Sequence, residues 1–171
     1  MAEKQNFTTL LSKVILPKVE VIAIIISSIG FLLYLLKQTG AQQLLMIGLS
    51  TLASVFFITA YTLPPAIEKT LTETTKRSFF DTLLNFIWKI RHIALSVSVI
   101  GLLFYLLNLN GYTQMILIGT TILIIALLLS GFFVIQKNDY LLLFKAALIK
   151  GLLIAFISST ILYNIWPSIN S

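Results

Sequence analysis

The residues of this sequence that could do chemistry are few and scattered. Its one histidine, His92, follows Arg91, and no second histidine or nearby acidic residue accompanies it. A general base or a metal ligand needs such partners, so we interpret His92 as a polar side chain at the edge of an apolar run. There is no cysteine, glycine-rich phosphate loop, nucleophile motif or pair of carboxylates. The sequence therefore predicts no catalytic, cofactor-binding or metal site, and no enzyme.

Hydroxyl groups are the polar groups found in the middle of the long apolar runs, and they usually bond back to their own helix. They belong to Ser50, Thr51, Ser54, Thr59, Ser96, Thr120, Thr121 and Ser130. No Asp, Glu, Lys or Arg lies deep in any of these runs. Proton relays and ion pumps normally need such a residue, which argues against a stand-alone ion-driven transporter.

The elements that must position these residues are membrane helices. Of the 171 residues, 58% are hydrophobic and 11% are charged, more apolar surface than a soluble domain of this size can bury. Apolar runs long enough to cross a bilayer occupy Val19–Leu36, Leu44–Leu63, Ile90–Leu109, Met115–Ile135 and Ala146–Trp166. We therefore predict an all-α integral membrane protein with about five transmembrane helices, and Lys150 interrupts the start of the fifth run.

The distribution of Lys and Arg predicts the orientation. Eleven of the 12 lie on the side of the N-terminus and Lys37 alone lies on the other, so we expect a cytoplasmic N-terminus and an external C-terminus. This topology signal accounts for the net charge of +6 better than a nucleic-acid partner does, because the basic residues form no stripe or arm.

An internal repeat is the most specific feature of the chain. Shifting the sequence by 71 residues lays Ile22–Leu52 on Ile93–Leu123 without a gap, and 14 of the 31 aligned pairs are identical. Because each copy holds two spans, both copies face the same way, which predicts two parallel duplicated hairpins and a C-terminal span. The chain then divides into a first hairpin with its lead-in (1–63), an amphipathic interfacial connection (64–89), a second hairpin (90–135) and a C-terminal part (136–171).

The repeat also selects candidate site residues. Small residues recur at matched places on the helices, where they let backbones approach closely in lipid: Ser27, Gly30 and Gly48 in the first copy, and Ser98, Gly101 and Gly119 in the second. A single transmembrane glycine can be merely tolerated, but recurrence favours packing. Glu20 and Arg91 are also equivalent in the alignment, and this predicts an ion pair between the hairpins; alternatively, each side chain extends to its own headgroup region.

The first hairpin resembles a known family. Gly40-Ala41, the segment Leu45–Thr51, Phe56-Phe57 and the closing Pro64-Pro65 are similar to the two-helix hairpin of the GldL-type motor subunit of gliding motility and type 9 secretion in the Bacteroidota. The resemblance implies a bacterial inner membrane and a hairpin suited to helix assembly. The family carries a membrane glutamate where this chain has Leu52 and Leu123, so the motor chemistry is not implied.

Two functions remain open at this stage. The favoured one is a non-catalytic inner-membrane scaffold or accessory subunit that sits in the lipid bilayer and assembles, as a homo-oligomer or in a larger membrane complex, through the small-residue faces. The alternative is a small transporter or channel for a neutral or apolar solute. If Gly48 and Gly119 face a water-filled cavity rather than another helix, the alternative is favoured.

Overall fold

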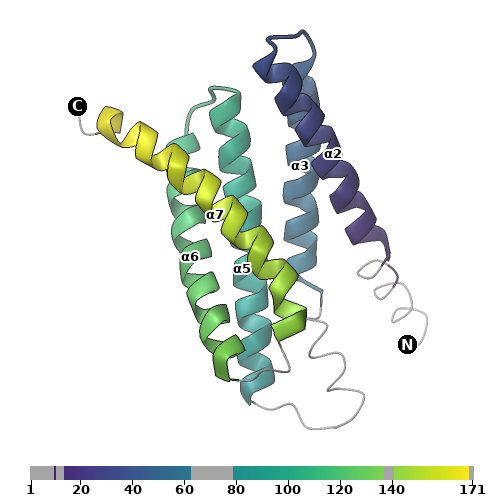
Figure 1. Cartoon of the computed structure of the whole chain (residues 1–171), viewed down its shortest axis with the longest axis vertical. Coiled ribbons are helices and arrows are strands. Elements are labelled where there is room, and N and C mark those ends of the chain that lie inside the picture. The colour runs from purple at the N-terminus through teal and green to yellow at the C-terminus, as the bar shows by residue number, and fades with distance from the viewer. Residues whose placement is uncertain (1–9, 11–13, 63–78, 137–140, 170–171) are drawn as a thin grey trace.

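The chain folds into long helices packed side by side (Figure 1). The computed structural model describes residue 10 and residues 14–62, 79–136 and 141–169. Its helices are α2 (Leu16–Leu35), α3 (Ala41–Ala60), α5 (Phe79–Leu106), α6 (Tyr112–Gln136) and α7 (Leu141–Ile169). The described residues form no strand. Helices suit apolar segments that lie in a bilayer, because a helix satisfies its own backbone hydrogen bonds.

Four of these helices are long and apolar enough to cross a membrane. By length and composition, the four candidate spans are Leu16–Leu35, Ala41–Ala60, Thr82–Leu106 and Tyr112–Phe132. The fifth predicted run lies in α7, in which the described part includes a shorter apolar stretch, Ile149–Asn164. Within the described residues, the all-helical architecture with four candidate spans is compatible with a helical membrane protein.

The helices pack in a simple order. Helix α2 packs on α3, α3 on α5, and α5 on α6, while α7 packs on α6 and more lightly on α5. Figure 1 shows α7 running obliquely across α5 and α6 rather than standing upright beside them. Buried residues make up 56% of the most apolar window of α5 but 11% of that of α2. Helix α5 is therefore the centre of the bundle and α2 is its edge.

The two hairpin turns have the same backbone. Lys37 and Asn108 have φ values of 54° and 53°, and Gly40 and Gly111 both have a φ of 88°. In each turn an amide N–H reaches back to a carbonyl five residues earlier, over 3.0 Å from Gln38 N to Leu33 O in the first and 2.8 Å in the second. This is the hydrogen-bond pattern of a Schellman motif, which ends a helix with a left-handed residue.

The predicted connection of residues 64–89 lies largely outside the described residues. Its last part belongs to α5, which runs without a break from Phe79 to Leu106. The third span was predicted to begin at residue 90, whereas the candidate span in α5 is Thr82–Leu106 and contains Lys89 and Arg91. A charged side chain does not interrupt the backbone hydrogen bonds of its own helix, so α5 continues through both residues.

Candidate functional site

The small residues predicted to pack are buried inside the two hairpins. A methyl carbon built on Gly48 would lie 2.5 Å from Ser27 Oγ and 2.7 Å from Ser27 N. The same carbon on Gly119 would lie 2.6 Å from Ser98 Oγ and 2.8 Å from Ser98 N. These distances leave no room for a side chain, so α2 meets α3, and α5 meets α6, at backbone contact.

The other two glycines of the prediction make the same kind of contact nearer the turns. A methyl carbon on Gly30 would lie 2.9 Å from Leu45 N, and one on Gly101 would lie 2.9 Å from Ile116 N. All six predicted residues are thus used within the chain. The close contacts of the four glycines are therefore contacts between helices of the same chain.

The hydroxyl groups behave as expected where their bonds are described. Those of Thr51, Ser54, Thr59 and Ser130 each donate to the carbonyl four residues earlier in their own helix, over 2.6 to 2.8 Å. Ser27 does the same to Ala23 O at 2.7 Å. The buried Oγ of Ser98 and Oγ1 of Thr120, on either side of the Gly119 contact, have no hydrogen-bond partner among the described atoms.

Arg91 and His92 lie in a cluster that joins α5 to the end of α3. The guanidinium carbon of Arg91 is 4.9 Å from the centroid of the Trp88 ring, at cation–π distance. His92 Nδ1 is 2.9 Å from Trp88 O, and the Trp88 indole donates to Thr59 O over 3.1 Å. Both Arg91 and His92 are buried, so this cluster holds α5 against the end of α3.

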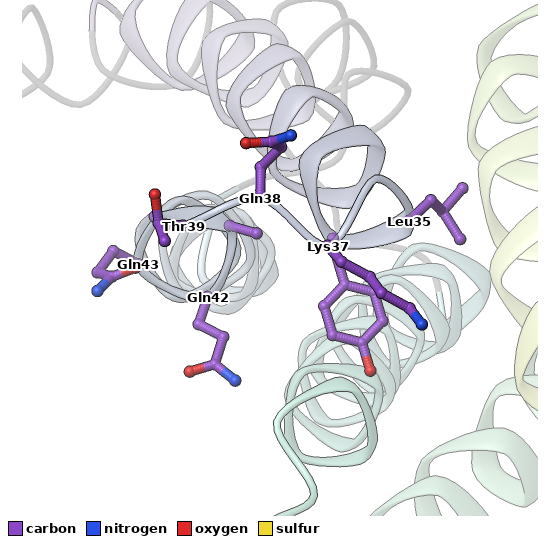
Figure 2. A pocket seen from close by; sticks show the side chains of 9 residues that line it. Leu35, Lys37, Gln38, Thr39, Gln42 and Gln43 are labelled. Carbon is purple, nitrogen blue, oxygen red and sulfur yellow. The ribbon is translucent and has the colours of Figure 1, made fainter.

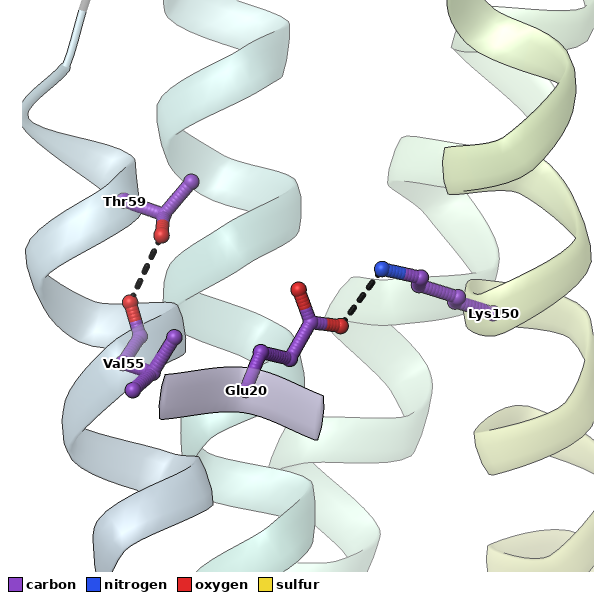
Figure 3. A network of polar contacts seen from close by, with 4 residues as sticks. All are labelled: Glu20, Val55, Thr59 and Lys150. Carbon is purple, nitrogen blue, oxygen red and sulfur yellow. Dashed lines mark hydrogen bonds and ion pairs between the residues drawn. The ribbon is translucent and has the colours of Figure 1, made fainter. Parts of the chain in front are cut away.

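Glu20 is paired with Lys150. Its Oε1 accepts a hydrogen bond from Lys150 Nζ at 2.5 Å, joining α2 to α7 (Figure 3). The prediction gave Glu20 the partner Arg91, and the described residues include no such ion pair. The reason is the packing order: α3 lies between α2 and α5, so the two equivalent positions are not neighbours.

A cavity of about 300 Å³, which we call the inner groove, lies below this ion pair. Its walls come from α2, α3, α5 and α7. Glu20 and Lys150 line it together with the hydroxyl-bearing residues Ser27, Ser28 and Ser158, and the rest of its lining is apolar. The sequence did not predict this groove, because it depends on how α7 lies against the two hairpins.

A second groove, which we call the outer groove, follows the same α3–α5 pair but is lined by neither α2 nor α7. It has a volume of about 550 Å³. Ser50 and Ser54, both exposed, line it with Ser96, Phe57 and Phe104.

A third pocket, of about 650 Å³, lies at the α2–α3 turn. Figure 2 shows its polar side chains, among them Lys37, Gln38 and Gln42, around the turn. These amides and one ammonium group supply no paired acid and base. The pocket therefore offers no catalytic arrangement.

Comparison of the chain with known protein families, with curated proteins and with solved structures finds no match. Within the described part of the chain, no three His, Cys, Asp or Glu residues gather in a group that could hold a metal ion. Function must therefore be argued from the chain's own grooves and contacts.

Proposed function

We propose that this protein is a non-catalytic scaffold or accessory subunit of a bacterial inner membrane. The observation that carries the proposal is the contact of Gly48 with Ser27 and of Gly119 with Ser98. In a transporter or channel, small residues at these places would line a path for the solute. Here they hold helices together, which favours a rigid assembly element over a conduit.

The outer groove is the surface that we assign to assembly. Its two exposed serines are small, and Ser54 Oγ already donates to Ser50 O at 2.8 Å. A neighbouring helix can therefore approach α3 closely, and the Ser54 hydroxyl needs no partner from it. The phenyl rings of Phe57 and Phe104 supply apolar contact area beside the serines. The occupant is a transmembrane helix of a second copy or of a larger membrane complex.

The proposal also includes a common origin of the two hairpins and a cytoplasmic N-terminus. The matched φ values of the turns and the matched glycine contacts support a common origin of the two hairpins. The asymmetry of Lys and Arg supports a cytoplasmic N-terminus. The likeness of the Gly40–Pro65 segment to the GldL-type hairpin supports a role beside motility or secretion components, without the motor chemistry.

Partner capture tests this function. The full chain is purified in mild detergent, its mass is measured, and co-purifying proteins are identified. We expect an oligomer or a stable partner, and loss of either in Ser54→Phe, which fills the outer groove. Thr160→Phe is the matched control, because the Thr160 hydroxyl is also exposed and bonds to its own helix, over 2.9 Å to Phe156 O, but lines neither groove.

A strictly monomeric protein without partners would contradict the scaffold. Liposome swelling with glycerol or urea then tests the alternative function. Flux above that of empty liposomes would favour the small transporter or channel.

A further inference from the structure

We propose that the inner groove is a binding site for one phospholipid with a zwitterionic phosphoethanolamine headgroup, whose acyl chain fills the groove while the headgroup sits on Glu20 and Lys150. This site is separate from the assembly surface on the outer groove. The proposal rests on the charge pair, on the apolar walls and on the size of the cavity.

The ion pair of Glu20 and Lys150 complements a headgroup that carries one positive and one negative charge. Glu20 supplies a carboxylate and Lys150 an ammonium group, side by side in the lining of a mostly apolar cavity. One hydrogen bond between them leaves two ammonium protons and most carboxylate lone pairs for a ligand. The Lys150 side chain is 49% exposed and that of Glu20 15%. A lipid phosphate can thus approach Lys150 while the lipid ammonium approaches Glu20.

The groove below the pair suits a hydrocarbon chain. Ser27 and Ser28, which line it, already donate to Ala23 O and Ile24 O of their own helix over 2.7 and 2.8 Å. Their hydroxyls therefore need no polar ligand. The remaining lining side chains are apolar apart from Ser158. An acyl chain can pack against these apolar side chains without leaving a polar group unpaired.

The volume selects a lipid chain over a protein helix. Ten residues of helix, about 15 Å long and about 10 Å wide, fill roughly 1,200 Å³. The cavity holds about 300 Å³, at the lower limit of ordinary ligand pockets. Because four helices wall the inner groove, an occupant must fit inside it, and a single slender chain does so where a helix does not. The outer groove is lined by α3 and α5 alone, so a helix can lie across it without filling it.

Lipid competition tests the site. The full chain in detergent is mixed with equal amounts of phosphatidylethanolamine, phosphatidylcholine and phosphatidylglycerol with identical acyl chains, and native mass spectrometry records which lipid stays bound. We expect phosphatidylethanolamine to be retained about fivefold over phosphatidylglycerol, which has no ammonium group to pair with Glu20, a ratio that corresponds to roughly 1 kcal/mol. We expect a similar preference over phosphatidylcholine, because its quaternary ammonium has no N–H to donate to the Glu20 carboxylate. Equal retention of all three, or preference for phosphatidylglycerol, would overturn the proposal.

Single substitutions test the acyl-chain groove and the headgroup site separately. Ser28→Phe fills the groove and should abolish retention, whereas Thr160→Phe, a matched exposed hydroxyl outside both grooves, should keep it. Glu20→Gln should keep a bound lipid but lose the preference for phosphatidylethanolamine over phosphatidylglycerol. If Glu20→Gln kept the wild-type preference for phosphatidylethanolamine, the headgroup would not bind at the ion pair of Glu20 and Lys150.

Crosslinking keeps the proposal testable if Ser28→Phe fails to fold. Leu153 lines the groove, and its neighbour Leu152 does not, although both are well exposed. A photoreactive p-benzoylphenylalanine in place of Leu153 should give a phospholipid adduct in the detergent-purified protein, and one in place of Leu152 should not. A polypeptide adduct at Leu153 would identify a protein occupant and reject the lipid. Loss of partners in the assembly experiment leaves this result unchanged, so the two proposals fail separately.

Discussion

Gly48 lies against Ser27 so closely that a methyl group on its Cα would come within 2.7 Å of the Ser27 amide nitrogen. Gly119 has the same relation to Ser98 in the second hairpin, at 2.8 Å. In each hairpin one glycine thus sets how near two helices can come. Because lipid gives no hydrophobic driving force between helices, this close packing is a main source of hairpin stability.

Gly48→Ala and Gly119→Ala should each destabilise the protein. The added methyl group meets backbone atoms, so the helices must move apart, and overpacking of this kind costs about 1–3 kcal/mol. Leucine at either position should be worse. Thermal unfolding of the detergent-solubilised protein measures the effect.

Gly131→Ala is the matched control for this prediction. Gly131 is also in the middle of a helix, but a methyl carbon built on it meets no atom within 4 Å. Alanine there should leave stability unchanged or raise it by about 0.5–1 kcal/mol, because alanine favours helix. Equal unfolding temperatures for Gly48→Ala and Gly131→Ala would show that the contact does not hold the hairpin together.

Ser27→Ala and Ser98→Ala should differ, although the two serines are equivalent in the repeat. Ser27 Oγ donates to Ala23 O, whereas the buried Ser98 Oγ has no hydrogen-bond partner among the described atoms. Removing an unsatisfied buried hydroxyl relieves a desolvation cost of about 1–3 kcal/mol, so Ser98→Ala should raise the unfolding temperature. Ser27→Ala should lower it slightly. A loss of stability in Ser98→Ala would mean that its hydroxyl has a partner such as a bound water.

Most of the helical architecture follows from the sequence because it depends on local patterns. Uninterrupted apolar runs predict α2, α3 and α6, and the glycines at 40 and 111 mark the turns, where both adopt the left-handed backbone. Four of the five predicted spans meet the length and composition of a membrane helix within the described residues. The start of the third span was predicted less accurately, because the run was expected to begin at residue 90 and the candidate span in α5 is Thr82–Leu106.

The candidate site depends on which helices are neighbours, and the sequence pattern does not specify that. The repeat gives Glu20 and Arg91 equivalent places in the chain, but not adjacent ones. Lys150 lies outside the two aligned copies, and nothing in the local sequence indicates that α7 brings it to Glu20. The inner groove is likewise a product of four helices that are distant in sequence.

The ion pair between Glu20 and Lys150 should contribute modestly to stability. Its side chains are 15% and 49% exposed, so solvent screens the attraction, and we expect a coupling energy below about 1 kcal/mol. A double-mutant cycle with Glu20→Gln and Lys150→Gln, read by thermal unfolding, measures it. The cycle with Glu20→Gln and Arg91→Gln should be additive, because α3 separates the two positions. Coupling to Arg91 equal to that with Lys150 would restore the pairing expected from the repeat.

The C-terminus should be external, and reporter fusions test this together with the span count. The prediction rests on the Lys and Arg asymmetry, which places the connections after α3 and after α6 in the cytoplasm. If α7 crosses the bilayer from there, it must emerge on the other side. It lies obliquely across α5 and α6 (Figure 1), so its crossing needs a direct test. Alkaline phosphatase, which folds only outside the cytoplasm, should be inactive when fused after residues 70 and 139 and active after residue 171. A cytoplasmic reporter, such as green fluorescent protein, should give the reverse pattern at the same three sites. An inactive phosphatase after residue 171, with the two internal fusions unchanged, would mean that α7 lies in the membrane without crossing it and that the chain has four spans.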